Sequence, residues 1–324
     1  MNIGFYIKWD KYSIKSKFNV IGDELWGEAL CKSINKQFID ISAELYAPNY
    51  LPSAKLDFLI YLNDSEINQA LADRHILYLQ NGYGEEAEEI IKNLVKYNYD
   101  GYVFFSRKMQ EIYEKKYKRV DSLYLPFGVD LEMFYPRKTD PSYSFDCSYI
   151  GNDIKGEEAT MKYIYPAVNF NFGLFGNWKI RRARFKIWEN FYKKAPYQKV
   201  FEKLSRGKIA QENVPYLYSS TKINLNCTLQ SCIDWNVITL RTFEVLACKG
   251  FLITDSVPSA QETMKEFMIF TTGGTDLIDK ITYYLLHEEE RKHIAQKGYE
   301  YVIQNCSIDA ISKELIQYMK GIVK

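Results

Sequence analysis

The sequence has 324 residues, more than one hydrophobic core usually organises, so we expect two domains separated by a cleft. With 47% hydrophobic and 26% charged residues, the composition is typical of a globular protein and excludes a disordered or low-complexity chain. The 42 basic residues almost balance the 41 acidic ones, which excludes a wide electrostatic field for nucleic acid or acidic lipid. A ligand must therefore be recognised by side chains gathered at one site and not by the net charge of the chain.

The N-terminal stretch MNIGFYIKWDKY has no long apolar segment and no small-residue cleavage site. No window reaches the ~18 consecutive apolar residues that a membrane-spanning helix needs. The six cysteines are scattered and form no CxxC pair, which is typical of reduced thiols in an intracellular protein. We therefore expect a cytoplasmic protein without a transmembrane segment, and a peripheral contact with a membrane stays open.

In the first part of the chain, short apolar runs alternate with helical patterns. The predicted strands cover residues 2–7, 56–62, 75–80 and 100–106, and the predicted helices include 24–34 and 109–117. Such alternation favours a parallel sheet covered on both faces. We assign residues 1–136 to this α/β domain, because Pro126, Pro136, Pro141 and the polar run RKTDPS mark a linker near 136–143.

The second part of the chain repeats the pattern over residues 144–304. Strands are predicted at 145–151, 170–176, 223–228, 250–255 and 268–272, with helices around 158–165, 181–193, 239–249, 258–266, 275–287 and 288–303. Two domains of one α/β architecture follow, without obvious sequence repetition.

In open parallel sheets, ligands bind beyond the carboxyl ends of the strands, where helix N-termini converge. Polar residues and glycines that directly follow predicted strands are therefore candidate binding residues. In the first domain these are Asn63, Asn81, Gly82 and Ser106, and in the second they include Gly151, Asn152, Gly176 and Asn226.

The stretch RTFEVLACKGFLITD reads as an amphipathic helix followed by a buried strand. Thr239 is placed as its N-cap and Gly250 as its stop. Arg241 and Glu244 lie one turn apart and off the apolar stripe, where they could form a solvated ion pair worth ~0.2–0.5 kcal/mol. At the ligand edge of a sheet, however, an arginine suits a diphosphate and a carboxylate suits two vicinal ribose hydroxyls. The pair then predicts a nucleotide-sugar clamp.

Several segments, in order, resemble the donor domain of group 1 glycosyltransferases of the CgeB-like, spore-protein-type branch. They are SYIGN, LFGNW, GKIAQENVPYLYSSTKINLNCT, RTFEVLACKGFLITD and TDLIDKITYYLLHEEERKHIAQKGYEYV, preceded by LPFGVDLEMFYP. The resemblance implies the GT-B fold, an α/β fold with two Rossmann-like domains facing each other across a cleft. The N-terminal domain would hold the acceptor, the C-terminal domain would hold the nucleotide-sugar, and a final helix over 305–324 would cross back to the first domain.

The resemblance also implies roles for individual donor-site residues. Glu244 matches the ribose-binding acidic position, and Arg241, followed by Thr242, matches the arginine that we assign to the diphosphate. Gly151 and Asn152 correspond to a phosphate loop. Gly176 and Trp178 would lie beside the base, and either Lys208 and Ile209 or the stretch from Asn213 to Tyr216 would line its pocket. Asn226 would contact the sugar or phosphate, with a structural role in its strand as the alternative.

One family feature is missing. The earlier acidic position of the group 1 motif is occupied by the stretch QSCIDWNVI, in which Asp234 is a weak substitute, so the sugar specificity and stereochemical outcome stay open. No Asp-x-Asp motif and no zinc-type spacing of histidines or cysteines occurs. We expect a metal-independent reaction with Arg241 and helix N-termini as the electrophilic side, and no cofactor besides the nucleotide-sugar co-substrate. Asp23 is the candidate acceptor base, with an N-cap or a solvated acid as the alternative.

The expected activity is transfer of a sugar from a nucleotide-diphosphate sugar to a glycan, a lipid-linked or a protein acceptor. Group 1 analogy favours retention of configuration, in which case no base such as Asp23 is needed. The alternative is a binding protein of the same fold without turnover. A nicotinamide dehydrogenase is disfavoured because no GxGxxG follows the first strand, and a nucleic-acid enzyme is disfavoured by the balanced charge.

Overall fold

A computed structural model describes residues 1–12, 22–79, 87–118, 121–179 and 195–322. The chain divides into two compact units. Unit 1 comprises residues 1–130, 234–238 and 304–324, and unit 2 comprises residues 131–233 and 239–303. Each unit is described by itself below.

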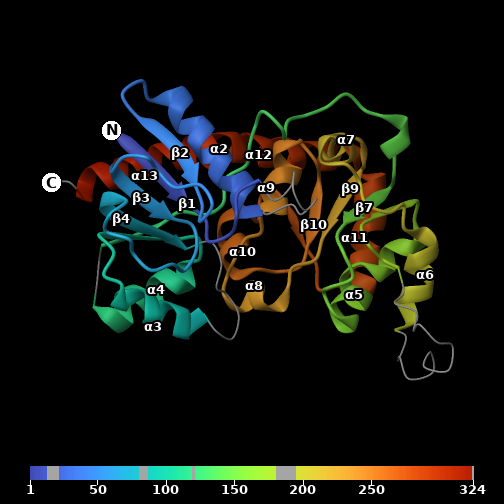
Figure 1. Ribbon diagram of the computed structural model, residues 1–324. Coiled ribbons are helices and arrows are strands. Elements are labelled where there is room, and N and C mark those ends of the chain that lie inside the picture. Colours follow the sequence, from blue (N-terminus) through green and yellow to red (C-terminus); the bar gives the residue numbers. More distant parts are fainter. Residues whose placement is uncertain (13–21, 80–86, 119–120, 180–194, 323–324) are drawn as a thin grey trace, which may run out of the picture. The chain divides into compact units, whose positions relative to one another are not determined.

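Unit 1 is built on a parallel sheet of six strands in the order β2-β1-β3-β4-β5-β6. The strands are β1 (Asn2–Tyr6), β2 (Ser42–Tyr46), β3 (Leu56–Tyr61), β4 (Ala72–Leu79), β5 (Gly101–Phe104) and β6 (Ser122–Tyr124), and the helices are α2 (Gly22–Gln37), α3 (Ala87–Lys96), α4 (Arg107–Tyr117) and α13 (Ile308–Ile322). Figure 1 shows α3 and α4 on one face of this sheet and α2 and α13 on the other.

The core of unit 1 depends on α13, although this helix is far from the other elements in sequence. Its apolar side packs with that of α2 against β1, β3 and β4 in one continuous buried cluster. The Ser33 hydroxyl donates to the Asp309 carboxylate at 2.7 Å, which ties the two helices together. The C-terminal helix is thus part of the hydrophobic core of unit 1.

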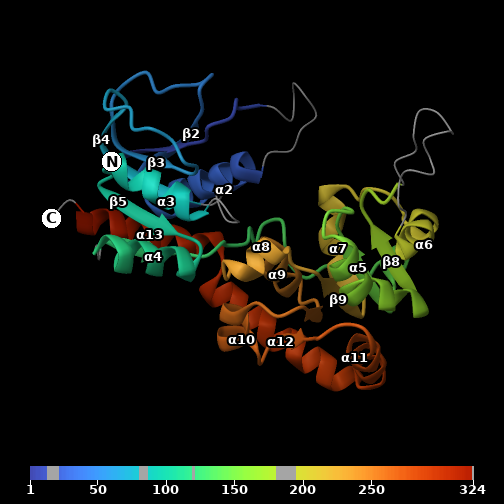
Figure 2. The ribbon, with the colours of Figure 1, turned by 90° about the horizontal axis from the view of Figure 1, so that it is seen from below.

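Unit 2 has a parallel sheet of five strands in the order β11-β10-β9-β7-β8. Its strands are β7 (Cys147–Ile150), β8 (Phe172–Phe175), β9 (Ile223–Asn226), β10 (Leu252–Thr254) and β11 (Ile269–Phe270). The helices are α5 (Glu157–Tyr163), α6 (Pro196–Leu204), α7 (Val214–Ser220), α8 (Gln230–Asp234), α9 (Leu240–Ala247), α10 (Pro258–Met264), α11 (Thr275–Leu286) and α12 (Glu288–Asn305). Figure 2 shows α11 and α12 close together, and both contribute to one buried cluster with the sheet.

The predicted strands are confirmed, and the α/β class with two parallel sheets is confirmed. The prediction missed the two edge strands of the unit 1 sheet, β2 and β6. In β2, with the sequence SAELY, polar and apolar residues alternate, and β6 has only three residues. It also missed α3, α6, α7 and α8, and the predicted helix at 181–193 lies outside the described residues.

The sequence predicts that Gly250 ends α9, but Gly250 is not the residue with the left-handed backbone that ends this helix. The residue that takes the left-handed conformation after this helix is Lys249, with φ 56°. Gly250 is needed for close packing instead, because a Cβ there would lie 2.8 Å from the Asn224 amide nitrogen and 2.9 Å from the Tyr218 carbonyl oxygen. Glycine therefore allows α7 and β9 to approach the end of α9.

Both sheets reverse their strand order at one place. With strands numbered along each unit, unit 1 begins 2-1-3-4-5, and unit 2 has the same order if β7 is counted as its first strand. In doubly wound sheets, ligands bind at such a switch point, at the carboxyl ends of the first and third strands. The candidate positions are therefore the ends of β1 and β3 in unit 1 and of β7 and β9 in unit 2.

Candidate active site

The loops after β7 and β8 in unit 2 are joined by their backbones. Gly151 donates its N–H to the Phe175 carbonyl at 2.9 Å, and Asn152 accepts from the Asn177 N–H at 2.8 Å. Gly176 has φ +127°, and a Cβ at this position would lie 1.9 Å from the Gly151 carbonyl oxygen. Only glycine fits such an approach. Three predicted residues, Gly151, Asn152 and Gly176, thus lie together at the carboxyl edge.

Arg241 in the first turn of α9 reaches the end of the central strand β9. Its guanidinium donates to the Asn226 side-chain oxygen at 3.2 Å and lies 5.7 Å from the centre of the Tyr149 ring. Asn226 is buried and donates to the Thr254 hydroxyl at 3.2 Å. The predicted residues Arg241 and Asn226 are therefore in direct contact at the switch point between β7 and β9.

A buried carboxylate fixes this strand edge. Asp255, which directly follows β10, is 1% exposed and accepts from the Thr228 N–H and the Thr228 hydroxyl, both at 2.7 Å, and from the Thr254 hydroxyl at 3.0 Å. These bonds hold the loop that follows β9 in one conformation. Sequence analysis missed Asp255, although an aspartate directly after a buried strand was a usable signal.

Lys155 is a second cation at this edge that sequence analysis missed. It follows β7 and is half-buried. Burial, and then the nearby charge of Arg241, lower the pKa of its ammonium group. Within the described part of the chain, Lys155 and Arg241 form no ion pair with a carboxylate. Two half-buried cations without carboxylate partners form a site that attracts an anion.

Glu244 lies one turn further along α9 and is half-buried. Burial raises the pKa of its carboxyl to about 7, although the charge of Arg241 lowers it in part. Its carboxylate accepts no hydrogen bond from the described residues, and Arg241 donates to Asn226 instead of pairing with it. The solvated ion pair considered from the sequence is therefore not formed. The oxygens of Glu244 remain open for a donor such as a hydroxyl.

The other residues predicted to contact the donor are Trp178, Thr242, Asn213 and Tyr216. Trp178 is 3% exposed, and its ring packs against Phe201 at 4.9 Å between centroids, so it supports the β8 loop from within the core. Thr242 is also buried. Asn213 is the last residue of a 3-10 helix. The guanidinium carbon of Arg137 lies 5.2 Å from the centre of the Tyr216 ring on α7.

The N-terminus of α9 has an unexpected feature. Thr239 occupies the N-cap position with extended backbone, but its side chain makes no capping bond, and its buried hydroxyl has no partner in the described structure. The Tyr149 hydroxyl is also buried, and it interacts with the nearby Arg241 guanidinium. Buried polar groups normally find a hydrogen-bond partner, so the Thr239 hydroxyl at the start of α9 indicates a position for ligand or water.

In unit 1, the switch point also gathers polar side chains. Asn63 after β3 is fully buried and donates to the Asp23 carboxylate at 2.9 Å, and it accepts from the Lys8 N–H at 3.2 Å. The Trp9 indole N–H lies 3.4 Å from the same Asp23 carboxylate. Asp23 is in the first turn of α2, and no capping bond from it accompanies these contacts among the described residues. The structure thus brings the predicted Asp23 and Asn63 together.

Exposed aromatic residues surround this group, and sequence analysis did not single them out. Trp9 is 45% exposed and Tyr12 is 44% exposed, while Tyr50 packs edge-on against Tyr12 at 6.4 Å. The Lys11 ammonium lies 5.2 Å and 4.8 Å from the Tyr12 and Tyr50 ring centres. Aromatic faces beside a carboxylate and an amide suit a sugar-like or other amphipathic ligand.

The remaining predicted acceptor residues are not part of this group. Ser106 is buried and caps α4, because it accepts from the Met109 N–H at 3.3 Å, and its hydroxyl donates to the Trp235 carbonyl at 2.5 Å. Asn81 and Gly82 lie outside the described residues. Across the described ranges, no group of three or more His, Cys, Asp or Glu side chains could hold a metal ion, and no helix is long and apolar enough to cross a membrane.

The two parallel sheets and the similarity to solved structures define an α/β protein with the GT-B fold. A family described as glycosyl transferase-like matches residues 171–317. Its match and the fold confirm the predicted resemblance to group 1 glycosyltransferases of the CgeB-like branch, and the family match supports a transferase enzyme.

Among individual relatives, the spore protein CgeB of Bacillus subtilis (strain 168) is 23% identical over 201 residues. The aligned region covers 59% of this chain and 59% of the length of CgeB.

Solved structures with a similar fold cover nearly the whole chain. Sucrose-phosphate synthase from Thermosynechococcus elongatus has a TM-score of 0.69 at 12% identity and covers 99% of both chains. Anabaena HepE in complex with UDP and glucose has a TM-score of 0.64 at 11% identity, covering 98% of this chain and 99% of HepE. T4 phage β-glucosyltransferase has a TM-score of 0.59 at 16% identity, with 98% and 99% coverage. At these identities the likeness shows the fold.

Proposed function

We propose that this protein transfers a sugar from a nucleoside-diphosphate sugar to an acceptor. The observation that carries the proposal is the pair of half-buried cations, Lys155 and Arg241, that face no ion-pairing carboxylate among the described residues and lie beside the open carboxylate of Glu244. This arrangement suits a ligand that combines a diphosphate with a pentose. UDP-glucose, which is bound in a structure of HepE and in one of the T4 phage enzyme, belongs to this class.

The two cations would act on the leaving group. When the bond between the sugar and the diphosphate breaks, negative charge builds on the leaving oxygen while the sugar becomes oxocarbenium-like. Arg241, Lys155 and the N-terminus of α9 would stabilise that charge, and Glu244 would accept hydrogen bonds from the ribose hydroxyls. The backbone around Gly151 and Gly176 would approach the phosphates closely, because no side chain intervenes. This mechanism needs no metal ion.

The acceptor would bind at the switch point of unit 1. Asp23 is held by Asn63 and Trp9, so its carboxylate has a fixed position from which it could remove a proton from an acceptor hydroxyl. In an inverting reaction this would make Asp23 the base. In the retaining reaction that the family resemblance favours, Asp23 would orient the acceptor without taking its proton.

The proposal is tested by thermal shift with UDP, GDP, TDP and CMP sugars. A donor at about 100 times its dissociation constant adds about 2.7 kcal/mol to the free energy of unfolding. Glu244→Ala should lose the shift, whereas Glu262→Ala, an exposed acid on α10, should keep it. Equal shifts in the two variants would contradict the ribose assignment.

Turnover separates an enzyme from a binding protein of the same fold. We expect slow release of free sugar from the donor that gives the largest shift, because transferases leak some donor to water. The rate should survive a chelator and fall in Arg241→Ala. A donor that binds tightly but is never hydrolysed or transferred to any glycan, lipid-linked or protein acceptor would favour the binding protein instead.

A further inference from the structure

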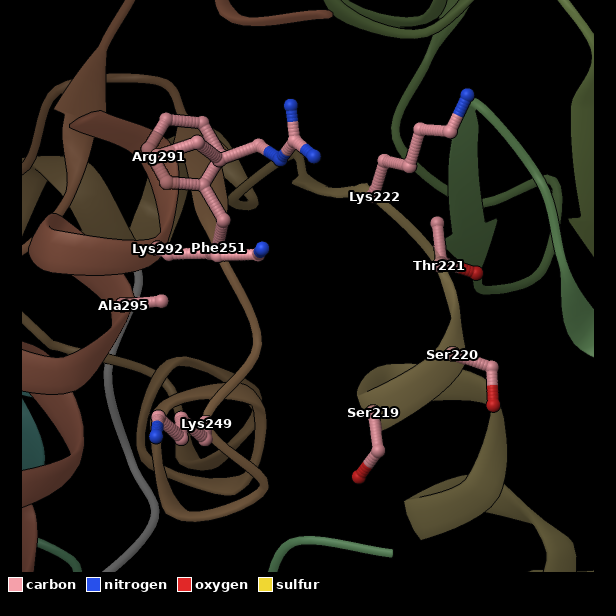
Figure 3. Close-up of a pocket in the computed structure, with 9 residues that line it drawn as sticks. All are labelled: Ser219, Ser220, Thr221, Lys222, Lys249, Phe251, Arg291, Lys292 and Ala295. Carbon is pink, nitrogen blue, oxygen red and sulfur yellow. The ribbon is translucent and has the colours of Figure 1, made fainter. Parts of the chain in front are cut away.

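Unit 2 contains a cavity of about 370 Å³ at the opposite edge of its sheet, away from the candidate active site. Lys222 directly precedes β9 and Phe251 directly precedes β10, so this cavity lies at the amino ends of the strands. Its walls are Ser219–Lys222 on one side and Lys249, Phe251, Arg291, Lys292 and Ala295 on the other (Figure 3). We call it the amino-edge pocket.

Four cations line the amino-edge pocket, namely Lys222, Lys249, Arg291 and Lys292. Two of them have acidic partners outside it: Lys222 pairs with Asp146 at 2.8 Å and Lys292 with Glu288 at 2.7 Å. Lys249 is exposed, and no carboxylate pairs with it among the residues that the structure describes. No acidic residue lines the pocket, although Glu288 beside it interacts with Lys222, Arg291 and Lys292. Its lining is therefore rich in positive charge.

Among these cations, Arg291 is the strongest indication of an anion site, because it is only 7% exposed. One guanidinium nitrogen donates to the Tyr284 carbonyl, and in the described structure no carboxylate lies within ion-pair distance. Burial lowers the pKa of this guanidinium, with Glu288 opposing in part. In Figure 3 the guanidinium of Arg291 and the ammonium of Lys292 extend from α12 towards the wall formed by Ser219–Lys222. A buried arginine with unused donors facing a cavity is suited to an anion.

We propose that the amino-edge pocket binds a phosphate group, carried either by a free phosphate compound or by a lipid headgroup. Several converging cations favour a multiply charged anion over a single carboxylate, and the planar guanidinium can bind two phosphate oxygens. The cavity has the size of a small-ligand site. Because the pocket is at the other edge of the sheet, this site is separate from the proposed donor site and does not depend on it.

The test compares Lys249→Glu with Lys297→Glu, which makes the same charge change on the exposed side of α12. Binding of inorganic phosphate and pyrophosphate is measured by isothermal titration at fixed ionic strength. Phosphate that binds at the proposed donor site contributes equally to the titrations of both variants, so it does not affect their difference. Lys249→Glu should weaken the binding about tenfold relative to Lys297→Glu, as expected for loss of a charge-assisted contact. Identical titrations would overturn the proposal.

Arg291→Gln gives a second, independent measurement, and its folding is checked by circular dichroism and by an unchanged thermal shift with the nucleotide-sugar. We expect a similar loss of phosphate binding. If Arg291→Gln does not fold, Lys249→Gln replaces it as the second variant. Unchanged phosphate affinity in a folded second variant would count against the site.

The source of the phosphate is resolved with vesicles of phosphatidylglycerol in phosphatidylcholine. Flotation with these vesicles, absent for pure phosphatidylcholine and lost in Lys249→Glu but not in Lys297→Glu, would identify a lipid headgroup. Titration of free phosphate without any flotation would identify a soluble phosphate compound. Either result supports the pocket, and the absence of both refutes it.

Discussion

If the proposed function holds, Lys155 shows how a chain with balanced charge would hold a strongly anionic ligand. The net charge of +1 says nothing about the edge of the unit 2 sheet, where Lys155 and Arg241 are gathered by the ends of β7 and the start of α9. A half-buried cation without a counter-ion is poorly solvated, so a bound diphosphate would replace both the lost water and the missing partner. The affinity proposed here would depend on where these cations lie and not on how many basic residues the chain has.

Lys155→Gln should weaken UDP binding about tenfold, because one charged contact to phosphate is lost. Binding of uridine, which has no phosphate, should not change. Isothermal titration with both compounds makes the comparison, and Lys199→Gln on the exposed side of α6 is the matched control. A parallel loss of uridine and UDP binding would point to misfolding rather than to a phosphate contact.

Glu244 should give the protein an unusual dependence on pH. The folded pKa is about 7 against an ordinary 4.5, so the folded chain keeps a proton that the unfolded chain releases between these values. The stabilisation is present below this window and is lost as pH rises through it, by about 1–3 kcal/mol. Nucleotide-sugar affinity should change in the opposite direction, because the ionised carboxylate accepts hydrogen bonds better.

Glu244→Gln removes this titration. Urea unfolding of the ligand-free protein on either side of the window should therefore show a smaller fall in stability with rising pH for the variant than for the wild type. Parallel curves for the two proteins would mean that the carboxyl has an ordinary pKa.

At the scale of elements, loop geometry at the carboxyl edge is set by backbone contacts between the β7 and β8 loops. Gly176 has a positive φ of 127° and almost touches the Gly151 carbonyl, while Gly207, whose carbonyl accepts from the Gly176 N–H at 2.8 Å, closes the other side. These contacts, with the hydrogen bond from the Asn177 N–H to the Asn152 side chain, bring the two loops close together. The proposed phosphate-binding surface would therefore depend on both loops and not on either alone.

Gly176→Ala should destabilise the protein by about 2–4 kcal/mol, because the new methyl group meets backbone and the backbone conformation is strained. Gly207→Ala is the control: its φ is +78°, but no atom lies within 4 Å of the added Cβ, so it should cost only about 1 kcal/mol. Chemical denaturation measures both. A smaller loss for Gly176→Ala than for Gly207→Ala would contradict the close approach.

At the scale of the whole molecule, each unit has its own hydrophobic core, and the chain returns to unit 1 at its end. Ile311, Leu315, Ile316 and Met319 on α13 are each at most 2% exposed. Burying each such side chain contributes about 1.5–3 kcal/mol, which for this helix sums to a large part of the stability of a domain. Unit 1 is thus completed by the last segment of the chain.

A chain ending at Asn305 should therefore fail to fold unit 1. Limited proteolysis and circular dichroism should show cleavage within residues 1–130 and loss of its cooperative transition, while Lys313→Ala, on the exposed side of α13, should behave like wild type. A truncated chain with an intact transition for unit 1 would show that α13 is dispensable.

The sequence by itself determined the α/β class and most strands, because hydrophobic periodicity and the order of motifs are local properties. It also predicted Arg241 and Glu244 as candidate site residues. It also indicated Asn63, which closely follows a strand, and Asp23, which lies at the start of the helix after the first strand. Only the tertiary structure placed Lys155 beside Arg241, left Glu244 without a hydrogen-bond partner among the described residues, and buried Trp178 in the core. Likewise, the amino-edge pocket joins residues from α7, α9 and α12 that no spacing connects. Charge compensation and burial depend on segments that are distant in sequence, and they are decided when the sheet is assembled.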